Sequence, residues 1–128
     1  MISLVFLSTL PLLNGCKKEG IGGDGKIQGC LYVHKWNATF TQFIGEYPGK
    51  DLYVYIVYGD HYGYDKRIKT DYNGNFEFPF LYKGNYTIYA YSRDSAYVDA
   101  SGTVAIVKKV SLTKNKQTIN LDTLLILE

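Results

Sequence analysis

The chain has 128 residues, which is the size of one ordinary globular domain. Its 14 basic and 12 acidic residues give a formal net charge of only +2 and are scattered along the sequence, so the composition argues against a nucleic-acid-binding protein. Thirteen tyrosines favour pleated, half-buried surfaces, and an all-β fold is therefore expected.

Residues 1–15 have the character of a secretory signal peptide. The run from Ile2 to Leu13 is almost wholly apolar, and no charged side chain occurs before Lys17. This run is too short to cross about 30 Å of hydrocarbon as a helix, which takes roughly 20 residues, but it fits the apolar region of a signal. It leads into Leu13-Asn14-Gly15-Cys16, which resembles the lipobox of bacterial lipoproteins.

The resemblance to a lipobox implies a role for Cys16. In that family a signal peptidase cleaves before a cysteine whose thiol carries a diacylglyceryl group, so Cys16 would become the first residue of a lipid-anchored protein. Each buried CH₂ contributes about 0.8 kcal/mol, so two or three acyl chains would hold the protein at a membrane. The expected location is the cell envelope, at the outer membrane, on a face that the sequence leaves open. A simple secretory signal and a buried N-terminal strand are the two alternatives.

Residues 16–25 are predicted to form a flexible tether, because they are polar and rich in glycine. Three of the glycines, Gly20, Gly22 and Gly25, match the spacing of a dinucleotide-binding loop. Such a loop must follow a strand and open a helix, and neither is expected here, so no phosphate site is predicted. The folded domain is expected to occupy residues 26–128.

From residue 26 onward, apolar residues recur with the period of two that is typical of strands. The strand at 52–58 is apolar on both faces and is expected at the centre of a sheet. Residues 35–47 are less patterned and fit a loop or an irregular edge strand. Asn73-Gly74 is expected to close a tight hairpin. The expected strands are 27–34, 52–58, 67–70, 75–80 with Phe76, Phe78 and Phe80 on one face, 86–91, 103–112, 117–121 and 124–127.

A family resemblance rests on two spaced motifs. Thr70-Asp71-x-x-Gly74-x-Phe76-x-Phe78, followed by Leu81-x-x-Gly84-x-Tyr86-x-Ile88-x-Ala90, resembles the signature of the carboxypeptidase-regulatory-like domain, which is a transthyretin-like β-sandwich. The segments Ile27-x-Gly29-x-Leu31 and Leu52-x-Val54 resemble the first two strands of that family. The resemblance implies a two-sheet Greek-key β-sandwich of about seven strands. It also implies an accessory module that docks or stabilises neighbouring proteins, and no peptidase activity.

No catalytic constellation is visible in the sequence, so an enzyme, a cofactor and a metal site are not expected. His34 and His61 lack the neighbours of a zinc peptidase. Asp60, His61 and Asp65 share a loop and could ligate a cation, although solvated loop polarity is the favoured interpretation. Cys30 has no partner for an internal disulfide other than the acylated Cys16 and is predicted to be a half-buried thiol.

Four tyrosines are candidate ligand-binding residues. Tyr53, Tyr55, Tyr89 and Tyr91 lie on the strand faces opposite the expected core. If their strands are neighbours, the rings would form a platform that could stack on sugar rings or on a partner's apolar patch. The alternative, favoured from the sequence alone, is that cross-strand tyrosine pairs only stabilise a solvent-facing sheet.

Two short motifs resemble acceptors of periplasmic O-glycosylation. They are Asp94-Ser95-Ala96 and Asp122-Thr123-Leu124, which makes Ser95 and Thr123 candidate modification sites.

Taken together, the sequence favours a non-enzymatic, membrane-anchored envelope lipoprotein that acts as an interaction or accessory module. Its partner would be another envelope protein or a glycan, and a carbohydrate-binding surface lipoprotein is the alternative.

Overall fold

Two β-sheets make up the part of the chain that the computed structural model describes, residues 19–95 and 102–128. These residues contain no helix, and hence none that could cross a membrane. The strands are β1 (Ile21–Trp36), β2 (Phe43–Pro48), β3 (Tyr53–Tyr58), β4 (Lys66–Lys69), β5 (Asn75–Leu81), β6 (Gly84–Arg93), β7 (Thr103–Leu112), β8 (Thr118–Asn120) and β9 (Leu124–Leu127).

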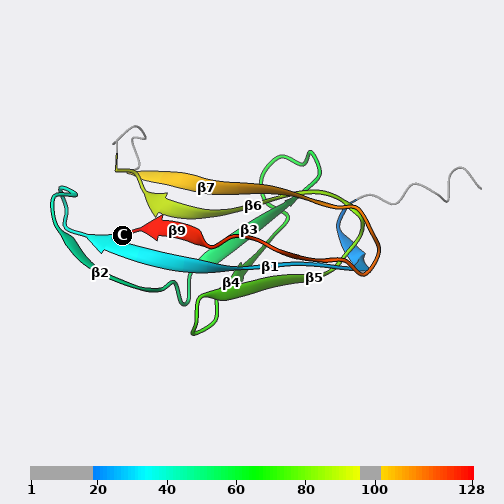
Figure 1. Ribbon diagram of the computed structural model, residues 1–128. Helices are drawn as coiled ribbons and strands as arrows, with labels where there is room; N and C mark the ends of the chain where they lie inside the picture. Colours follow the sequence, from blue (N-terminus) through cyan, green and yellow to red (C-terminus); the bar gives the residue numbers. More distant parts are fainter. Residues whose placement is uncertain (1–18, 96–101) are drawn as a thin grey trace, which may run out of the picture.

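The two sheets pack face to face as a β-sandwich (Figure 1), which confirms the expected fold class. One sheet contains β2, β1 and β5, with β8 and β9 also paired to β1, and the other has the order β4-β3-β6-β7. The described residues form nine strands where about seven were expected; β2 is the one that the list of expected strands lacked, because it forms where a loop or an irregular edge strand was expected. The core between the sheets consists of Ile27, Leu31, Val33, Val54, Ile56, Phe76, Phe78, Leu81, Tyr86, Ile88, Ala90, Leu112, Leu124 and Ile126.

The long strand β1 organises its sheet. Its first half pairs antiparallel with β5 and parallel with β8. Its second half pairs antiparallel with β2 and parallel with β9. The inward-facing residues Ile27, Leu31 and Val33 have no exposed surface at all. Because β1 is paired on both sides, it joins four other strands into one sheet, and β5, β8 and β9 among them are distant from it in sequence.

The sheet begins earlier than the sequence suggested, because β1 starts at Ile21, five residues before the expected domain boundary. The backbone N–H of Tyr82 donates to the carbonyl of Gly20 at 2.9 Å. The N–H of Gly20 donates to the Tyr86 hydroxyl at 2.9 Å, and that hydroxyl donates to the Tyr82 carbonyl at 2.7 Å. Gly20, expected to belong to a flexible tether, is therefore hydrogen-bonded at the turn between β5 and β6, and Ile21 and Gly25 pair with Leu81 at the end of β5.

The glycines of this segment are required by close packing. A Cβ at Gly23 would overlap the carbonyl oxygen of Leu81, and one at Gly25 would lie 2.9 Å from the same oxygen. Composition alone cannot distinguish glycines that allow two backbones to approach from glycines that make a linker flexible.

The Asn73-Gly74 turn does not close a hairpin. β4 pairs with β3 in one sheet and β5 pairs with β1 in the other, so the turn carries the chain between the sheets. Gly74 has a φ of +81° and lies directly against β1, where its carbonyl accepts from the N–H of Leu31 at 2.8 Å. A turn at this position was predicted correctly, but the hairpin was wrong: the strands on its two sides pair in different sheets, and only Gly74 of the two turn residues has a positive φ.

Phe80 does not share the buried face of Phe76 and Phe78. The register between β1 and β5 shifts at this point, and Phe80 adopts a φ of +61° with 65% of its surface exposed. This β-bulge rotates Leu81 into the core instead, where it is 2% exposed. The alternation of the sequence predicted that Phe80 would be buried and Leu81 exposed, because alternating hydrophobicity alone cannot show where a bulge occurs.

We predict that two glycine-to-alanine substitutions have unequal costs. Gly74 and Gly63 both have positive φ, but a Cβ at Gly74 would overlap the Leu31 carbonyl oxygen, whereas the position at Gly63 is open. Gly63→Ala should reduce the free energy of unfolding by about 1 kcal/mol from backbone strain, and Gly74→Ala by about 3 kcal/mol because overpacking is added. Urea denaturation measures both. Equal losses would contradict the packing of the turn against β1.

Candidate functional site

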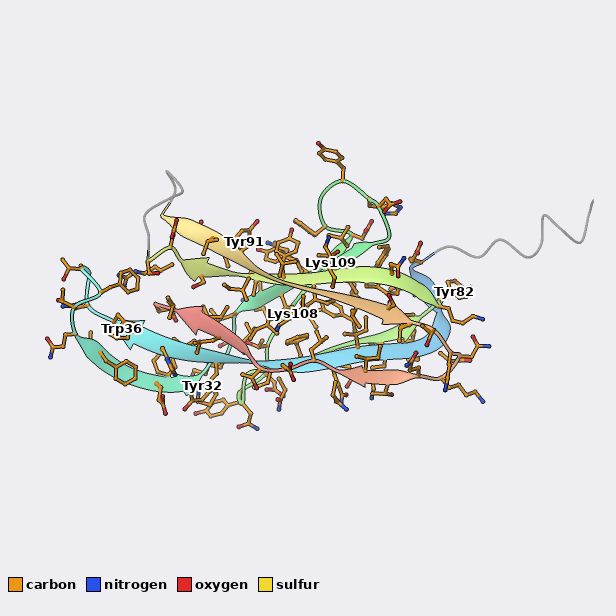
Figure 2. All side chains as sticks on the ribbon, turned by 45° about the horizontal axis from the view of Figure 1, so that its top comes forward. Tyr32, Trp36, Tyr82, Tyr91, Lys108 and Lys109 are labelled. Carbon is orange, nitrogen blue, oxygen red and sulfur yellow. The ribbon has the colours of Figure 1, made fainter. Side chains whose placement is uncertain are left out.

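The register between β3 and β6 brings the four candidate tyrosines together. Tyr55 lies opposite Tyr89, and the two rings stack with centroids 4.9 Å apart and planes 9° apart. Tyr53 lies 6.3 Å from Tyr55, while Tyr91 lies 5.5 Å from Tyr55 and 5.7 Å from Tyr89. Figure 2 shows Tyr91 on the outer side of the sheet that contains β6. The cluster follows from the core, because Val54, Ile56, Ile88 and Ala90 take the inward positions of the same strands.

One further ring and two cations complete the cluster. Tyr64, from the loop between β3 and β4, meets Tyr55 edge-on at 4.9 Å. The register of β4 on β3 places Arg67 opposite Tyr55 and Lys69 opposite Tyr53. The Arg67 guanidinium lies 4.1 Å from the centroid of the Tyr53 ring and the Lys69 ammonium 5.3 Å from it. We call Tyr53, Tyr55, Tyr64, Tyr89 and Tyr91 the tyrosine face.

Sequence reasoning missed these three additional residues for different reasons. Arg67 and Lys69 are two positions apart, so they lie on the same face of β4. Pairing of β4 with β3 would have placed both on the side of the sheet that carries the tyrosines. Tyr64 lies in a loop, where no periodicity operates, and only the folded loop places it on the face.

The tyrosine face has a supported centre and an exposed rim. Tyr55 and Tyr89 are half-buried beneath their neighbours. Tyr53, Tyr64 and Tyr91 are 38%, 48% and 52% exposed, respectively. The rim rings therefore present aromatic surface and hydroxyl groups to solvent, on a sheet whose other side is the hydrophobic core.

The charged residues in the strands of this sheet all have the same sign. Its four strands contain the basic residues Lys66, Arg67, Lys69, Arg93, Lys108 and Lys109 and no Asp or Glu. A hydrogen bond to the Tyr55 oxygen raises the pKa of the Arg67 guanidinium, so this group stays charged. Burial, and then the neighbouring Tyr91, raises the pKa of the Tyr89 hydroxyl, so this group stays neutral. The surface is therefore cationic and aromatic at neutral pH.

The loop from Gly59 to Asp65 uses its polar side chains internally. Nδ1 of His61 lies 2.7 Å from Oδ1 of Asp65, and Oδ2 of Asp65 accepts from the N–H of Tyr58 at 2.7 Å. Among residues 19–95 and 102–128, no group of three His, Cys, Asp or Glu side chains is arranged to hold a metal ion. His61 and Asp65 thus have a structural role in the loop that supports Tyr64.

The remaining candidates are placed as follows. Ser95 and Thr123 are both exposed outside strands, so each is accessible, and their glycosylation stays a prediction. Cys16 lies outside the described residues.

Cys30 is partly buried, and its thiol lies 3.5 Å from the carbonyl oxygen of Leu31. Burial raises its pKa, so Cys30 is a poor nucleophile at neutral pH.

A second aromatic group lies at the end of the sandwich where β1 meets β2. Phe43 packs edge-on against both His34 and Trp36, at 5.4 Å from each ring. The guanidinium of Arg93 lies 3.9 Å from the Phe40 ring and donates to the Trp36 carbonyl at 3.2 Å. These contacts order the loop that the sequence left unpatterned, and they occupy Arg93 away from the tyrosine face.

Comparisons with known proteins found similarity of fold only. No family model matches the chain, and neither does any curated protein sequence. A crystal structure of a proposed carbohydrate-binding protein from Pseudomonas aeruginosa aligns with a TM-score of 0.46 at 15% identity, covering 85% of this chain and 91% of that one. A crystal structure of (S)-allantoin synthase aligns with a TM-score of 0.44 at 16% identity, covering 92% of this chain and 45% of that one.

We predict that the stacked pair at the centre of the face is energetically coupled. In a double-mutant cycle on Tyr55→Ala and Tyr89→Ala, the two losses in unfolding free energy should differ from additivity by about 1 kcal/mol, the usual contribution of a stacked aromatic pair beyond its burial. The matched cycle pairs Tyr55→Ala with Tyr72→Ala, a ring that is 79% exposed on another loop, and should be additive. Additivity in both cycles would contradict the stacking.

Proposed function

We propose that this protein is a non-enzymatic binding module of the cell envelope, held at a membrane by a lipid on Cys16, and that its tyrosine face binds carbohydrate. The observation that carries the proposal is the exposed rim of Tyr53, Tyr64 and Tyr91 around a stacked pair.

The chemistry of the face matches that of a sugar. A pyranose ring has an apolar C–H face that packs on an aromatic ring, and hydroxyl groups at its edge that need hydrogen-bond partners. Tyrosine offers both a ring and a hydroxyl, and Arg67 adds guanidinium donors beside Tyr53. The rings are held by the sheet and by one another, so little side-chain entropy is lost when a ligand binds.

The charge of the sheet favours an acidic carbohydrate over a neutral one. Six basic residues and no acidic ones occur in β3, β4, β6 and β7. Arg93 is engaged by the neighbouring loop, which leaves Arg67, Lys69 and Lys109 available on the outward-facing side. A carboxylate on the ligand would pair with the guanidinium of Arg67 in a charge-assisted hydrogen bond.

Docking of another envelope protein is the second candidate function. The sheet ends at β7, whose outer edge has no paired strand among the described residues. Val104 and Val107 on this strand are 41% and 48% exposed. An exposed edge strand with apolar side chains can accept a partner strand, and the accessory role implied by the resemblance to carboxypeptidase-regulatory-like domains agrees with such a contact.

We predict that removal of two rim rings weakens glycan binding. Isothermal calorimetry with a galacturonate hexamer should show an affinity reduced about tenfold, or about 1.4 kcal/mol, for the Tyr53→Ala/Tyr91→Ala variant. Tyr62→Ala is the control, because that ring is fully exposed outside the tyrosine face and its loss should change nothing. Arg67→Met should reduce the preference for the galacturonate hexamer over cellohexaose. Glycan binding that is unaffected by loss of the rim rings would rule out the tyrosine face as the binding site.

We predict a lipid on Cys16 in material isolated from an envelope-bearing bacterial host. Intact-mass analysis should find a chain that starts at Cys16 and carries a diacylglyceryl group. Cys16→Ala should move the protein from the membrane fraction to the soluble fraction, whereas Cys30→Ala should leave it with the membrane. An unmodified thiol at Cys16, or a retained leader, would contradict the anchor.

A further inference from the structure

We propose that one end of the sandwich, formed by the start of β1 and the turn between β5 and β6, rests in the headgroup layer of the bilayer. We call it the anchor end and define it by Gly20, Ile21, Phe80, Tyr82 and Lys83. This inference rests on the lipid anchor proposed above and concerns what that anchor does to the orientation of the domain.

The connection between the anchor and the folded domain is very short. Only Lys17 and Lys18 separate Cys16 from Glu19, the first described residue. Three Cα-to-Cα steps reach about 11 Å even when fully extended. A headgroup layer is about 5–8 Å thick on each side of the hydrocarbon. A diacylglyceryl thioether on Cys16 therefore leaves Glu19 no more than a few ångströms beyond the membrane surface.

The first described residues are fastened to the domain and cannot lengthen this connection without breaking structure. The Glu19 carboxylate accepts from the N–H of Asn85 at 3.1 Å, and it lies against Gly84 and Gly59, where a Cβ would collide with it. Gly20 is bonded to both Tyr82 and Tyr86. Detachment of residues 19–21 from the domain would break these contacts, so the anchor end stays close to the lipid.

The side chains at this end fit a membrane surface. Ile21 is 54% exposed and pairs with Leu81, next to Phe80, which is 65% exposed. Phe80 holds a positive φ, a conformation that costs energy for a bulky residue and that here directs an aromatic ring into solvent. An exposed aromatic and an exposed isoleucine beside a lipid anchor can bury their apolar surface at the boundary between headgroups and acyl chains.

The charges at the anchor end are compatible with an anionic leaflet. Lys83 lies in the turn itself, and the pairing of Gly84 with Leu112 brings the following loop, with Lys114 and Lys116, to the same end. Glu19 and Asp24 are the acidic residues of the adjoining segment, Asp60 follows Gly59 beside Glu19, and Glu19 is already engaged with Asn85. With Lys17 and Lys18 of the sequence included, the five basic residues outnumber these three acidic ones.

The orientation follows from the length of β1. Figure 2 shows Tyr82 and Trp36 at opposite ends of the molecule. If Tyr82 lies at the headgroups, the group around Trp36 points away from the bilayer, and the tyrosine face, on the flank of the sandwich, remains open to a ligand.

Tryptophan fluorescence tests this orientation, because Trp36 is the only tryptophan in the chain. The lipidated full-length protein is reconstituted into phosphatidylcholine–phosphatidylglycerol vesicles with brominated acyl chains, which quench indoles at the acyl boundary. In a Trp36→Phe background, the Phe80→Trp variant should lose about half of its emission because its ring inserts at that boundary. The parent protein, with Trp36 alone, should lose none.

Two controls separate the possible outcomes. Ile21→Trp in the same background provides a second reporter if Phe80→Trp folds poorly, and a twenty-residue Gly-Ser insertion between Lys18 and Glu19 should weaken the quenching in either variant, because it removes the constraint of the short connection. Quenching of Trp36, or absence of quenching in both reporters, would overturn the inference while the anchor stands. An unlipidated Cys16 in the mass spectrum would instead overturn the anchor, and with it the orientation.

Discussion

The two-sided pairing of β1 is the constraint on which the rest of the structure depends. The strand pairs with β5 and β8 along one half and with β2 and β9 along the other, so four other strands take their register from it. Its inward residues form one wall of the core. Its first residues are bonded to Tyr82 and Tyr86, which fixes the point where the chain enters the domain. Core, sheet order and direction of the N-terminus thus depend on one strand.

The second sheet illustrates how a core leaves a surface free for binding. Val54, Ile56, Ile88 and Ala90 face inward and hold β3 and β6 in place. Because successive side chains alternate, the neighbouring residues point to the outer side of the sheet, and Tyr53, Tyr55, Tyr89 and Tyr91 are among them. Contacts between the rings stabilise the sheet, and this alone could explain why tyrosines occur here. Stability does not require that the rim rings be exposed or that the four strands lack acidic residues, and these two features suit a binding surface.

The sequence predicted features that follow from alternation and failed where backbone geometry decides. The four tyrosines could be assigned to one side of β3 and β6, and the central position of β3 followed from its two apolar faces. The bulge at Phe80, the partner of the Asn73-Gly74 turn and the contribution of Tyr64 depend on long-range packing that no local pattern records. The glycines near Gly23 were mistaken for a tether because close approach and flexibility require the same residue type.

The most direct test of the central claim, that the tyrosine face binds carbohydrate, is to follow the tyrosine ring resonances by NMR while a galacturonate oligomer is added. Binding at this face predicts saturable shifts for the rim rings Tyr53, Tyr64 and Tyr91. Tyr32, which projects from the opposite sheet, should not shift (Figure 2). Saturable shifts confined to Tyr32 and its neighbours, or no ring shift at saturating ligand, would contradict the account.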